Sequence, residues 1–233
     1  MERFGAPILR NGGEVMQGKN NFKRILSGIM SVAMAATLLP SLPAVAEDAA
    51  EKYPYTMFAA SDTEGAITIN ANNFCVNGNI ATNGTIVSSG NMNVNGTKTE
   101  NADEEMIYIL KKLNYSYFSG DNVETYADDY SFEDLNININ NPMDVNGTLE
   151  LTGNINLNSG IKAVEDVTIN GEVKNTNNSV ICSETGDINI ETSNVNFSGL
   201  IYAPYGDINI DTDNLNLNNV IIIGQTITID CPS

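Results

Sequence analysis

The chain has no histidine and no tryptophan among its 233 residues, and lysine and arginine together number only 11. The lack of histidine excludes Ser-His-Asp hydrolases, histidine-ligated zinc sites and most general bases that titrate near neutral pH. Because aspartate and glutamate number 29, the formal net charge is −18. So acidic a chain offers no basic stripe for phosphates, and we expect no nucleic-acid partner.

Cysteine is also scarce, with only Cys75, Cys182 and Cys231. No C-x-x-C pair is present, so the sequence gives no support for a metal or redox motif. An odd number leaves at least one thiol unpaired. We expect buried or half-buried thiols in a protein that does not depend on disulfides, and the pairing stays open.

The longest apolar stretch, 25–39, follows Lys23-Arg24 and precedes the motif Ala44-Val45-Ala46. This order of basic, apolar and small residues predicts a signal peptide over 1–46, cleaved after Ala46, with Met16 as an alternative start. A membrane span needs about 20 apolar residues, which this stretch does not reach before Pro40. No second stretch of that kind follows, so we expect a secreted, extracellular chain associated with the cell surface and without a transmembrane anchor.

Removal of residues 1–46 makes the remaining chain more acidic. The remaining chain has six lysines, no arginine and 27 acidic residues, a net charge of −21. A surface of this kind repels acidic polymers and anionic membranes.

Two segments, 183–202 and 203–222, align over 20 residues without a gap. Each contains Gly-Asp-Ile-Asn-Ile, a polar turn, an apolar-Asn-apolar triplet and a short apolar run. Such triplets place two aliphatic side chains on one face of a strand and a polar one on the other. Stacked coils bury those aliphatic faces together. The sequence therefore predicts an all-β fold, a parallel β-helix with coils of about 20 residues; a β-sandwich would show strand spacings of about 8–12 residues and no longer period.

The repeat predicts the organisation of the exported chain. First coils are expected over 47–100, an insertion over 101–134, and the main coils over 135–233, with a C-terminus that is truncated or ends in an open edge at 227–229. That edge suggests end-to-end self-association. The insertion combines near-helical apolar spacing over 102–113 with a cluster of aromatic residues. These are Tyr115, Tyr117, Phe118, Tyr126, Tyr130 and Phe132. We expect a helix and an aromatic loop that seal the flank of the solenoid, or alternatively a platform that stacks on sugars or peptides.

Stacking also predicts columns of polar side chains. The outward position of the first strand is occupied by Thr168, Asn189, Asn209 and Thr228 in successive coils, and by Thr68, Asn138 and Asn156 in other copies. Stacked asparagines hydrogen-bond along such a ladder. A flat face that orders water, as in ice-binding solenoids, is an alternative, although those faces usually have stricter threonine rows.

A second predicted column contains Asp166, Asp187 and Asp207, about 5 Å apart. These carboxylates suggest either a Ca²⁺ ladder or solvated turns. Parallel β-helices include lyases and hydrolases that use arginine, lysine, histidine or clustered aspartates. A glycosidase with two aspartates is chemically feasible, but no spacing selects a pair. We therefore predict no catalytic residues and no cofactor other than the candidate calcium.

The runs 53–60, 67–101 and Gly199-Leu200-Ile201-Tyr202-Ala203-Pro204-Tyr205-Gly206-Asp207 resemble the N-terminal β-helical region of large secreted surface proteins of anaerobic Gram-positive bacteria. The resemblance covers nearly all of the exported chain and carries no catalytic residues. It implies export, a solenoid fold and a role in presentation or adhesion, with glycans or proteins of a host or cell wall as partners. Two functions are expected: a non-enzymatic structural, stalk or adhesion module, or a protein that binds or cleaves a neutral glycan.

Overall fold

The computed structural model describes residues 55–175 and 178–232. The predicted signal peptide, its cleavage after Ala46 and the alternative start at Met16 therefore lie outside the described residues. Within the described ranges, no helix is long and apolar enough to cross a membrane.

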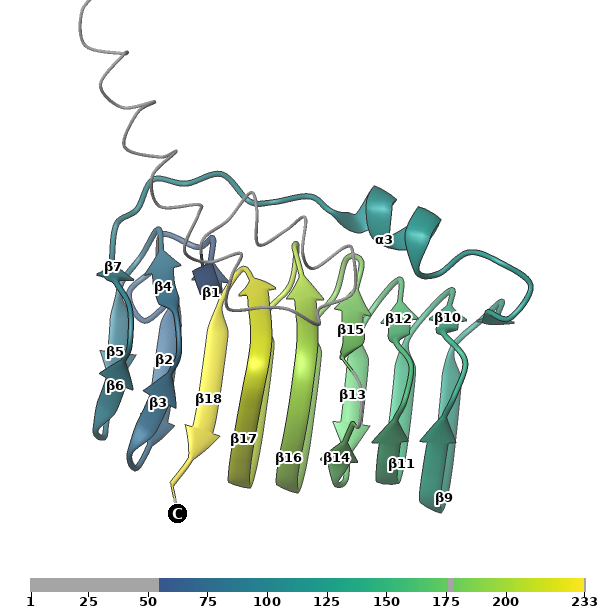
Figure 1. Ribbon diagram of the computed structural model, residues 1–233. Helices are drawn as coiled ribbons and strands as arrows, with labels where there is room; N and C mark the ends of the chain where they lie inside the picture. The colour runs from purple at the N-terminus through teal and green to yellow at the C-terminus, as the bar shows by residue number, and fades with distance from the viewer. Residues whose placement is uncertain (1–54, 176–177, 233) are drawn as a thin grey trace, which may run out of the picture.

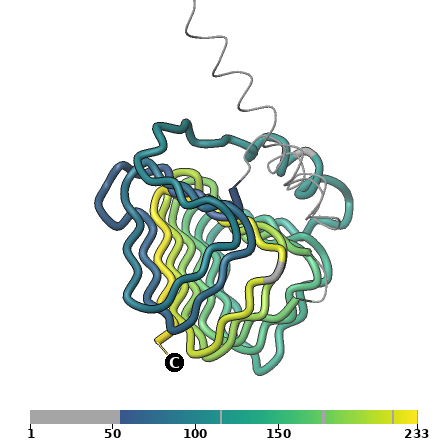
Figure 2. Tube along the Cα trace, turned by 60° about the vertical axis from the view of Figure 1, so that its left-hand side comes forward, coloured from purple at the N-terminus to yellow at the C-terminus, as the bar shows by residue number. Residues whose placement is uncertain are grey.

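The described chain forms a parallel β-solenoid with three faces (Figures 1 and 2), as the repeat predicts. Some strands bend around a corner and contribute to more than one face. The first face contains β5 (Ile86–Ser88), β2 (Ile67–Ala71), β18 (Ile227–Cys231), the starts of β17 (Ile208–Gly224) and β16 (Ile188–Ala203), β13 (Val167–Asn170), and the starts of β11 (Leu149–Leu157) and β9 (Tyr130–Ile139). All these pairs are parallel, which excludes a sandwich of hairpins.

The other two faces follow around the corners. The second face contains β6 (Met92–Val94), β3 (Phe74–Val76), the middles of β17 and β16, β14 (Val173–Lys174), and the ends of β11 and β9. The third face contains β7 (Lys98–Thr99), β4 (Asn79–Thr82), β1 (Tyr55–Ala59), the ends of β17 and β16, β15 (Ser179–Ser183), β12 (Ile161–Ala163), β10 (Met143–Val145) and β8 (Glu124–Tyr126).

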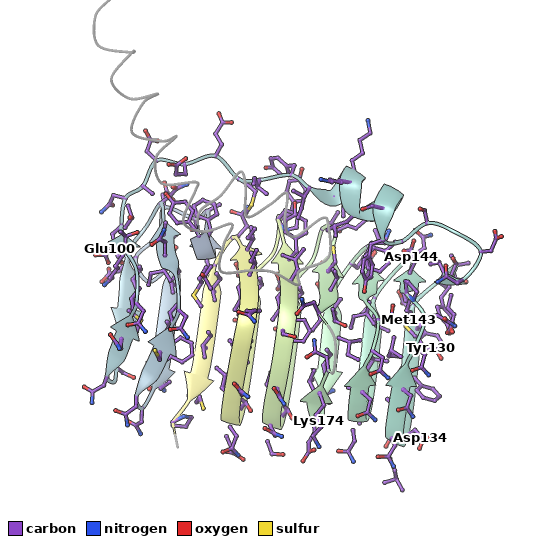
Figure 3. The ribbon with its side chains drawn as sticks, viewed as in Figure 1. Glu100, Tyr130, Asp134, Met143, Asp144 and Lys174 are labelled. Carbon is purple, nitrogen blue, oxygen red and sulfur yellow. The ribbon has the colours of Figure 1, made fainter. Side chains whose placement is uncertain are left out.

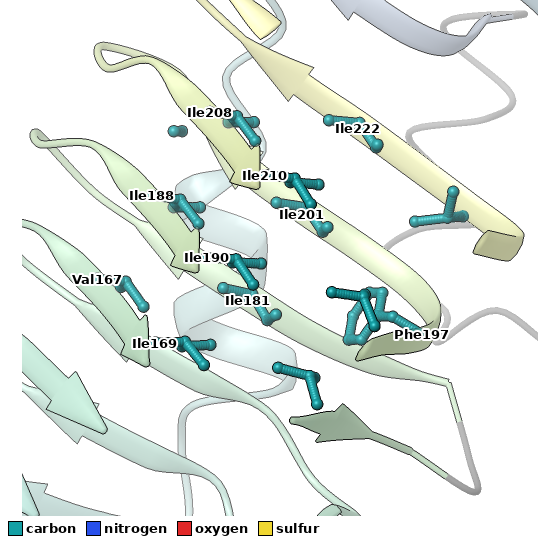
Figure 4. Packing of buried hydrophobic residues seen from close by; sticks show 14 of the residues in the cluster. Val167, Ile169, Ile181, Ile188, Ile190, Phe197, Ile201, Ile208, Ile210 and Ile222 are labelled. Atoms are coloured by element: carbon teal, nitrogen blue, oxygen red, sulfur yellow. The ribbon is translucent and has the colours of Figure 1, made fainter. Parts of the chain in front are cut away.

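Inward-facing aliphatic side chains form continuous columns inside the solenoid. Ile188 pairs with Val167 on one side and with Ile208 on the other, and all three are fully buried (Figure 4). The triplets of the repeat supply these positions because alternate residues of a strand point to the same face. Burying one such side chain stabilises the fold by about 1.5–3 kcal/mol, so each coil depends on its neighbours for most of its stability.

The order of the coils differs from the order of the chain. Thr228 of β18 pairs with Asn209 of β17 and with Thr68 of β2, so the last strand lies between the main coils and the first coils (Figure 1). In the same coil, β1 lies between β17 and β4. The prediction of an open edge at 227–229 is therefore wrong, because β2 pairs with this strand. Strand β18 thus offers no surface for end-to-end association. The edges of the stack are formed by β5–β7 at one end and by β8 and β9 at the other.

The insertion is shorter than its predicted range of 101–134. The helix α3 spans only Leu110–Ser116, and residues 102–109 cross the third face without regular structure. Its buried residues Ile107 and Ile109 alternate, which suits an extended chain better than a helix. Strands β8 and β9 belong to the solenoid itself, since Tyr126 pairs with Val145.

The insertion covers the outer surface of the third face. That surface is apolar and includes Phe58, Cys182, Leu200, Tyr202 and Ile223. Ile107, Ile109, Leu113 and Phe118 of the insertion pack against it. The third-face strands are thus buried on both sides, which explains why β15 and the end of β17 consist of nearly unbroken apolar runs.

The three cysteines are all unpaired. Cys182 and Cys231 are buried, as expected, whereas Cys75 is exposed on the second face. Within the described residues the fold therefore depends on stacking, and no disulfide contributes to it.

Candidate functional site

The first face carries the predicted ladder of threonine and asparagine. Thr168, Asn189, Asn209, Thr228 and Thr68 are consecutive partners in the strand register. The amide of Asn209 donates a hydrogen bond to the side-chain oxygen of Asn189 at 2.9 Å. The ladder is therefore continuous through the coil that contains β18.

Two members of the predicted ladder lie elsewhere. Asn138 and Asn156 pair with one another on the second face, where Asn156 also pairs with Lys174. Their assignment to the first face is wrong because the triplets of the two faces have the same local pattern. The triplets of the two faces can be told apart only by their distance along the chain from the preceding corner.

The second face presents an asparagine face, made by Asn138, Asn156, Lys174, Asn196 and Asn216. Asn156 donates to Asn138 at 3.0 Å, and Asn216 donates to Asn196 at 3.3 Å. In the strand register Lys174 stands between these two pairs, and it is the only charged member. The result is a row of side-chain amides at strand spacing, about 4.8 Å.

The aspartate column, Asp166, Asp187 and Asp207, lies at the corner before the first face. The backbone N–H of Asp187 donates to Oδ1 of Asp166, and that of Asp207 donates to Oδ1 of Asp187, both at 2.8 Å. Each carboxylate thus satisfies a backbone group of the next coil. A Cβ on Gly186 would lie 2.2 Å from Oδ1 of Asp166, so a side chain at this position would displace that carboxylate.

Asp129 belongs to the same corner and was missed from the sequence. Its Oδ1 accepts the backbone N–H of Thr148 at 2.9 Å, as Oδ1 of Asp166 does for Asp187. The available signal was an aspartate directly before a strand. Among the described residues, no group of three acidic or cysteine side chains is placed to hold a metal ion. Calcium binding by the aspartate column stays a prediction.

A buried lysine forms a connected polar cluster. Lys162 on β12 points outward from the third face, where α3 covers it, and its side chain is 6% exposed. Its Nζ lies 2.8 Å from Glu184 Oε1, 3.0 Å from Asp144 Oδ1 and 2.8 Å from Asn114 Oδ1. The ring of Phe118 lies 5.6 Å from Nζ. Figure 3 places Asp144 beside α3.

The charges in this cluster act in opposite directions. Burial lowers the pKa of Lys162, but the hydrogen bonds that its ammonium donates to Glu184 and Asp144 outweigh this effect, so the pKa is raised above its ordinary value. Beside it, burial raises the pKa of the Cys182 thiol. The lysine is a buried cation between two carboxylates, and Cys182 is an unreactive neutral thiol. Sequence patterns did not reveal this cluster, because it exists only once α3 is docked.

An aromatic cluster closes the end of the stack at β8 and β9. Tyr130 and Phe132 occupy inward positions, opposite Leu149 and Leu151 of the next coil. The rings of Tyr126 and Tyr130 are 3.9 Å apart, and Tyr130 stacks with Phe132 at 6.3 Å. Burial, followed by the contact with Tyr130, raises the pKa of Tyr126 to about 12. These rings close the end of the stack, and the expectation that they seal the insertion to the flank is wrong; Phe132 remains 39% exposed.

A hollow lies along the corner where β1, β4, β7 and β17 of the third face end. It has a volume of about 520 Å³ and is lined by Ala60, Ser61, Asp62, Asn83, Asn101, Asp103 and Gln225. The lining is polar, and a small-molecule site is typically lined mostly by apolar side chains. This hollow does not resemble such a site.

The fold and surfaces together define a β-solenoid with one covered face and two polar faces. No known protein family and no curated protein matches the chain. Among solved structures it is similar to an ice-binding protein from the Antarctic ascomycete Antarctomyces psychrotrophicus, with 11% identity, 76% of this chain and 94% of that chain covered, and a TM-score of 0.33. It is also similar to an ice-binding protein from an Antarctic biological consortium, with 11% identity, 76% and 87% covered, and a TM-score of 0.29. At these values the likeness concerns the fold alone, and no function or residue is transferred.

Proposed function

We propose that the chain is a secreted, cell-surface and non-enzymatic β-solenoid that serves as a structural or adhesion module. The observation that carries this proposal is the asparagine face. It is a regular row of amides on a rigid parallel sheet, with Lys174 as its only charged member. Such a surface suits contact with an extended polymer better than with a small ligand.

The chemistry of the amides indicates the kind of partner. An asparagine side chain has two N–H donors and an oxygen that accepts twice, and the bond between Asn156 and Asn138 uses one donor and one acceptor. A ladder of amides therefore retains hydrogen-bonding capacity for hydroxyl groups. Because the chain carries a net charge of −18, acidic polymers are disfavoured. A neutral, hydroxyl-rich glycan of a cell wall or host surface fits both conditions.

The placement of reactive groups supports a non-enzymatic role. Lys162 and Cys182 are buried beneath the insertion, where a substrate has no access. The aspartate column is engaged with backbone N–H groups of neighbouring coils. Neither set contributes a residue to the lining of the hollow.

Binding to insoluble neutral polysaccharides and to a glycan array tests the proposal. The variant Asn138→Asp/Asn156→Asp adds two charges to the asparagine face with little change of shape. We expect binding at least about tenfold weaker, or about 1.4 kcal/mol. The matched control is Asn189→Asp/Asn209→Asp, an adjacent amide pair on the first face with the same kind of hydrogen bond. Equal losses in both variants, or none in either, would contradict an adhesive role for the asparagine face.

Export is tested separately. We expect the secreted protein to begin at Glu47, which sequencing of its N-terminus checks. An uncleaved chain that stays inside the cell would contradict this part of the proposal.

A glycan-binding role at the aromatic end is the second candidate. The parallel rings of Tyr130 and Phe132, with an interplanar angle of 14°, favour it, because sugars stack on exposed aromatic faces. Phe132→Ala would then abolish glycan binding while the asparagine-face variant retained it. A reducing-sugar assay on the same glycans tests whether any binding leads to cleavage.

A water-ordering first face has less support. Next to the threonine–asparagine ladder runs a second outward column that includes Glu191, Asp211 and Asp230 as consecutive partners. Such a row of carboxylates interrupts a flat uncharged surface. We expect no thermal hysteresis in solutions of this protein, and a measurable hysteresis would restore the alternative.

A further inference from the structure

Three polar side chains from separate parts of the chain meet beneath the insertion. Asn114 lies on α3, Lys162 on β12, and Glu184 directly follows β15. Lys162 Nζ contacts both of the others at 2.8 Å, and Asn114 Nδ2 donates to Glu184 Oε1 at 3.2 Å. The three groups thus form a closed triangle of lysine amine, asparagine amide and carboxylate.

We propose that Lys162 and Asn114 join in an intramolecular isopeptide bond, with Glu184 as the carrier of the protons. The bond would link the insertion covalently to the wall of the solenoid. It concerns a region apart from the asparagine face and does not rest on the proposed function.

The orientation of the Asn114 amide is fixed by its partners. An ammonium only donates hydrogen bonds, and an ionised carboxylate only accepts them. The Oδ1 atom must therefore face Lys162, and Nδ2 must face Glu184, as observed. This arrangement places the leaving nitrogen next to the carboxylate that can deliver a proton to it.

The reacting atoms are already close. Since Oδ1 lies 2.8 Å from Nζ and a C=O bond is about 1.2 Å long, Cγ lies about 3–4 Å from Nζ. Near-attack geometries have reacting atoms about 3–3.5 Å apart. The hydrogen bond holds Nζ near the carbonyl oxygen, and the terminal torsion of asparagine is broad. A rotation about that torsion turns the face of Cγ toward Nζ.

The proposed reaction balances within these groups. The Lys162 ammonium gives one proton to Glu184, and the freed Nζ lone pair attacks Cγ of Asn114. A second proton leaves Nζ as the new C–N bond forms, while the Cγ–Nδ2 bond breaks. Nδ2 takes up both protons through Glu184 and departs as ammonium, and Glu184 returns to its carboxylate form. No oxidant, reductant or further reactant is required.

The surroundings favour this reaction over hydrolysis. Lys162 is 6% exposed in its side chain and Glu184 is 18% exposed, with Phe118 covering the amine. Few water molecules therefore compete with Nζ for Cγ. The two carboxylates keep the lysine protonated for most of the time, so the step is slow. It has to occur only once in each molecule.

Asp144 provides a matched comparison with Glu184. It contacts Nζ at 3.0 Å but is not a partner of the Asn114 amide in the hydrogen bonds that define the triangle. Glu184 bridges the amine and the leaving group, whereas Asp144 stabilises only the amine. The role of Glu184 as a proton carrier can thus be distinguished from that of Asp144 as a counter-ion.

Mass spectrometry of the purified full chain tests the proposal. We expect an intact mass lower than that of the sequence by one ammonia. Trypsin should no longer cut after Lys162, and digestion after acidic residues should release a branched peptide that contains Asn114 and Lys162. The branched peptide is decisive, because Asn-Gly pairs such as Asn83-Gly84 also lose ammonia when they form succinimides.

Four variants complete the test. Lys162→Arg and Asn114→Ala should abolish the branched peptide, Glu184→Gln should reduce its yield at least tenfold, and Asp144→Asn should retain it. Circular dichroism of each variant confirms that the solenoid has formed. A native chain of full mass without the branched peptide would overturn the proposal. Retention in Glu184→Gln together with loss in Asp144→Asn would overturn the role assigned to Glu184.

Discussion

Removal of one hydroxyl group tests how the insertion is held on the third face. The Tyr202 hydroxyl donates to the carbonyl oxygen of Ile107 at 2.7 Å and accepts the backbone N–H of Ile109 at 3.1 Å. Tyr202→Phe leaves the ring in place but deprives both backbone groups of their partner. Both residues are buried, at 1% and 8% exposure, so water does not readily replace the hydroxyl.

The expected cost follows from those two groups. Each buried polar group without a partner costs about 1–3 kcal/mol, so we expect the free energy of unfolding to fall by about 3 kcal/mol. This is a large share of the roughly 5–15 kcal/mol of a typical domain. Urea unfolding measures the change, and amide hydrogen exchange at Ile109 should accelerate. Tyr205→Phe is the control, since Tyr205 is 58% exposed. A loss below about 0.5 kcal/mol in Tyr202→Phe would refute the view that this hydroxyl anchors the insertion.

Three further predictions concern the corners and the end of the stack. Gly153 has φ +137° and its Cβ would lie 1.7 Å from the carbonyl oxygen of Asp134, so we expect Gly153→Ala to cost at least about 3 kcal/mol in urea unfolding; a neutral substitution would contradict the close approach. The neutral Tyr126 phenol, with its pKa raised to about 12, contributes stability that is present below pH 10.0 and is lost as the pH rises toward 12. The difference in stability between the parent and Tyr126→Phe should therefore shrink over that range, and a constant difference would be evidence against it. Because the aspartate column already accepts backbone N–H groups, millimolar Ca²⁺ should leave the melting temperature unchanged, whereas a rise that EDTA reverses would support the calcium ladder.

The period of the repeat was enough to predict the fold and part of its register. Residues 183–202 and 203–222 align without a gap, and the structure pairs Ile188 with Ile208 and Asn189 with Asn209. This works because in a parallel stack each side chain lies above its counterpart in the neighbouring coil. The continuous Thr168–Thr228 ladder and the aspartate column followed from the same rule.

The order in which the coils stack could not be predicted from the repeat. The triplets Ile67-Thr68-Ile69 and Ile227-Thr228-Ile229 are identical, yet nothing local indicates that they pair with one another. Asn138 and Asn156 were placed on the wrong face for a related reason, since inward and outward alternation is the same on every face. The Lys162 cluster was also out of reach, because Asn114 reaches it only through the path of the insertion across the third face.

The coil shared by β1 and β18 has a consequence for the order of folding. An ordinary solenoid can grow from one end as the chain emerges, since each coil contacts only its neighbours in sequence. Here the side chain of Asn70 hydrogen-bonds to Asp230, 160 positions away. The first coils therefore gain β18 as a neighbour only after that strand has been synthesised. Closing so long a loop is entropically costly, so the two halves join late and slowly. A chain of this topology cannot join its two halves into one cooperative unit before β18 has been synthesised.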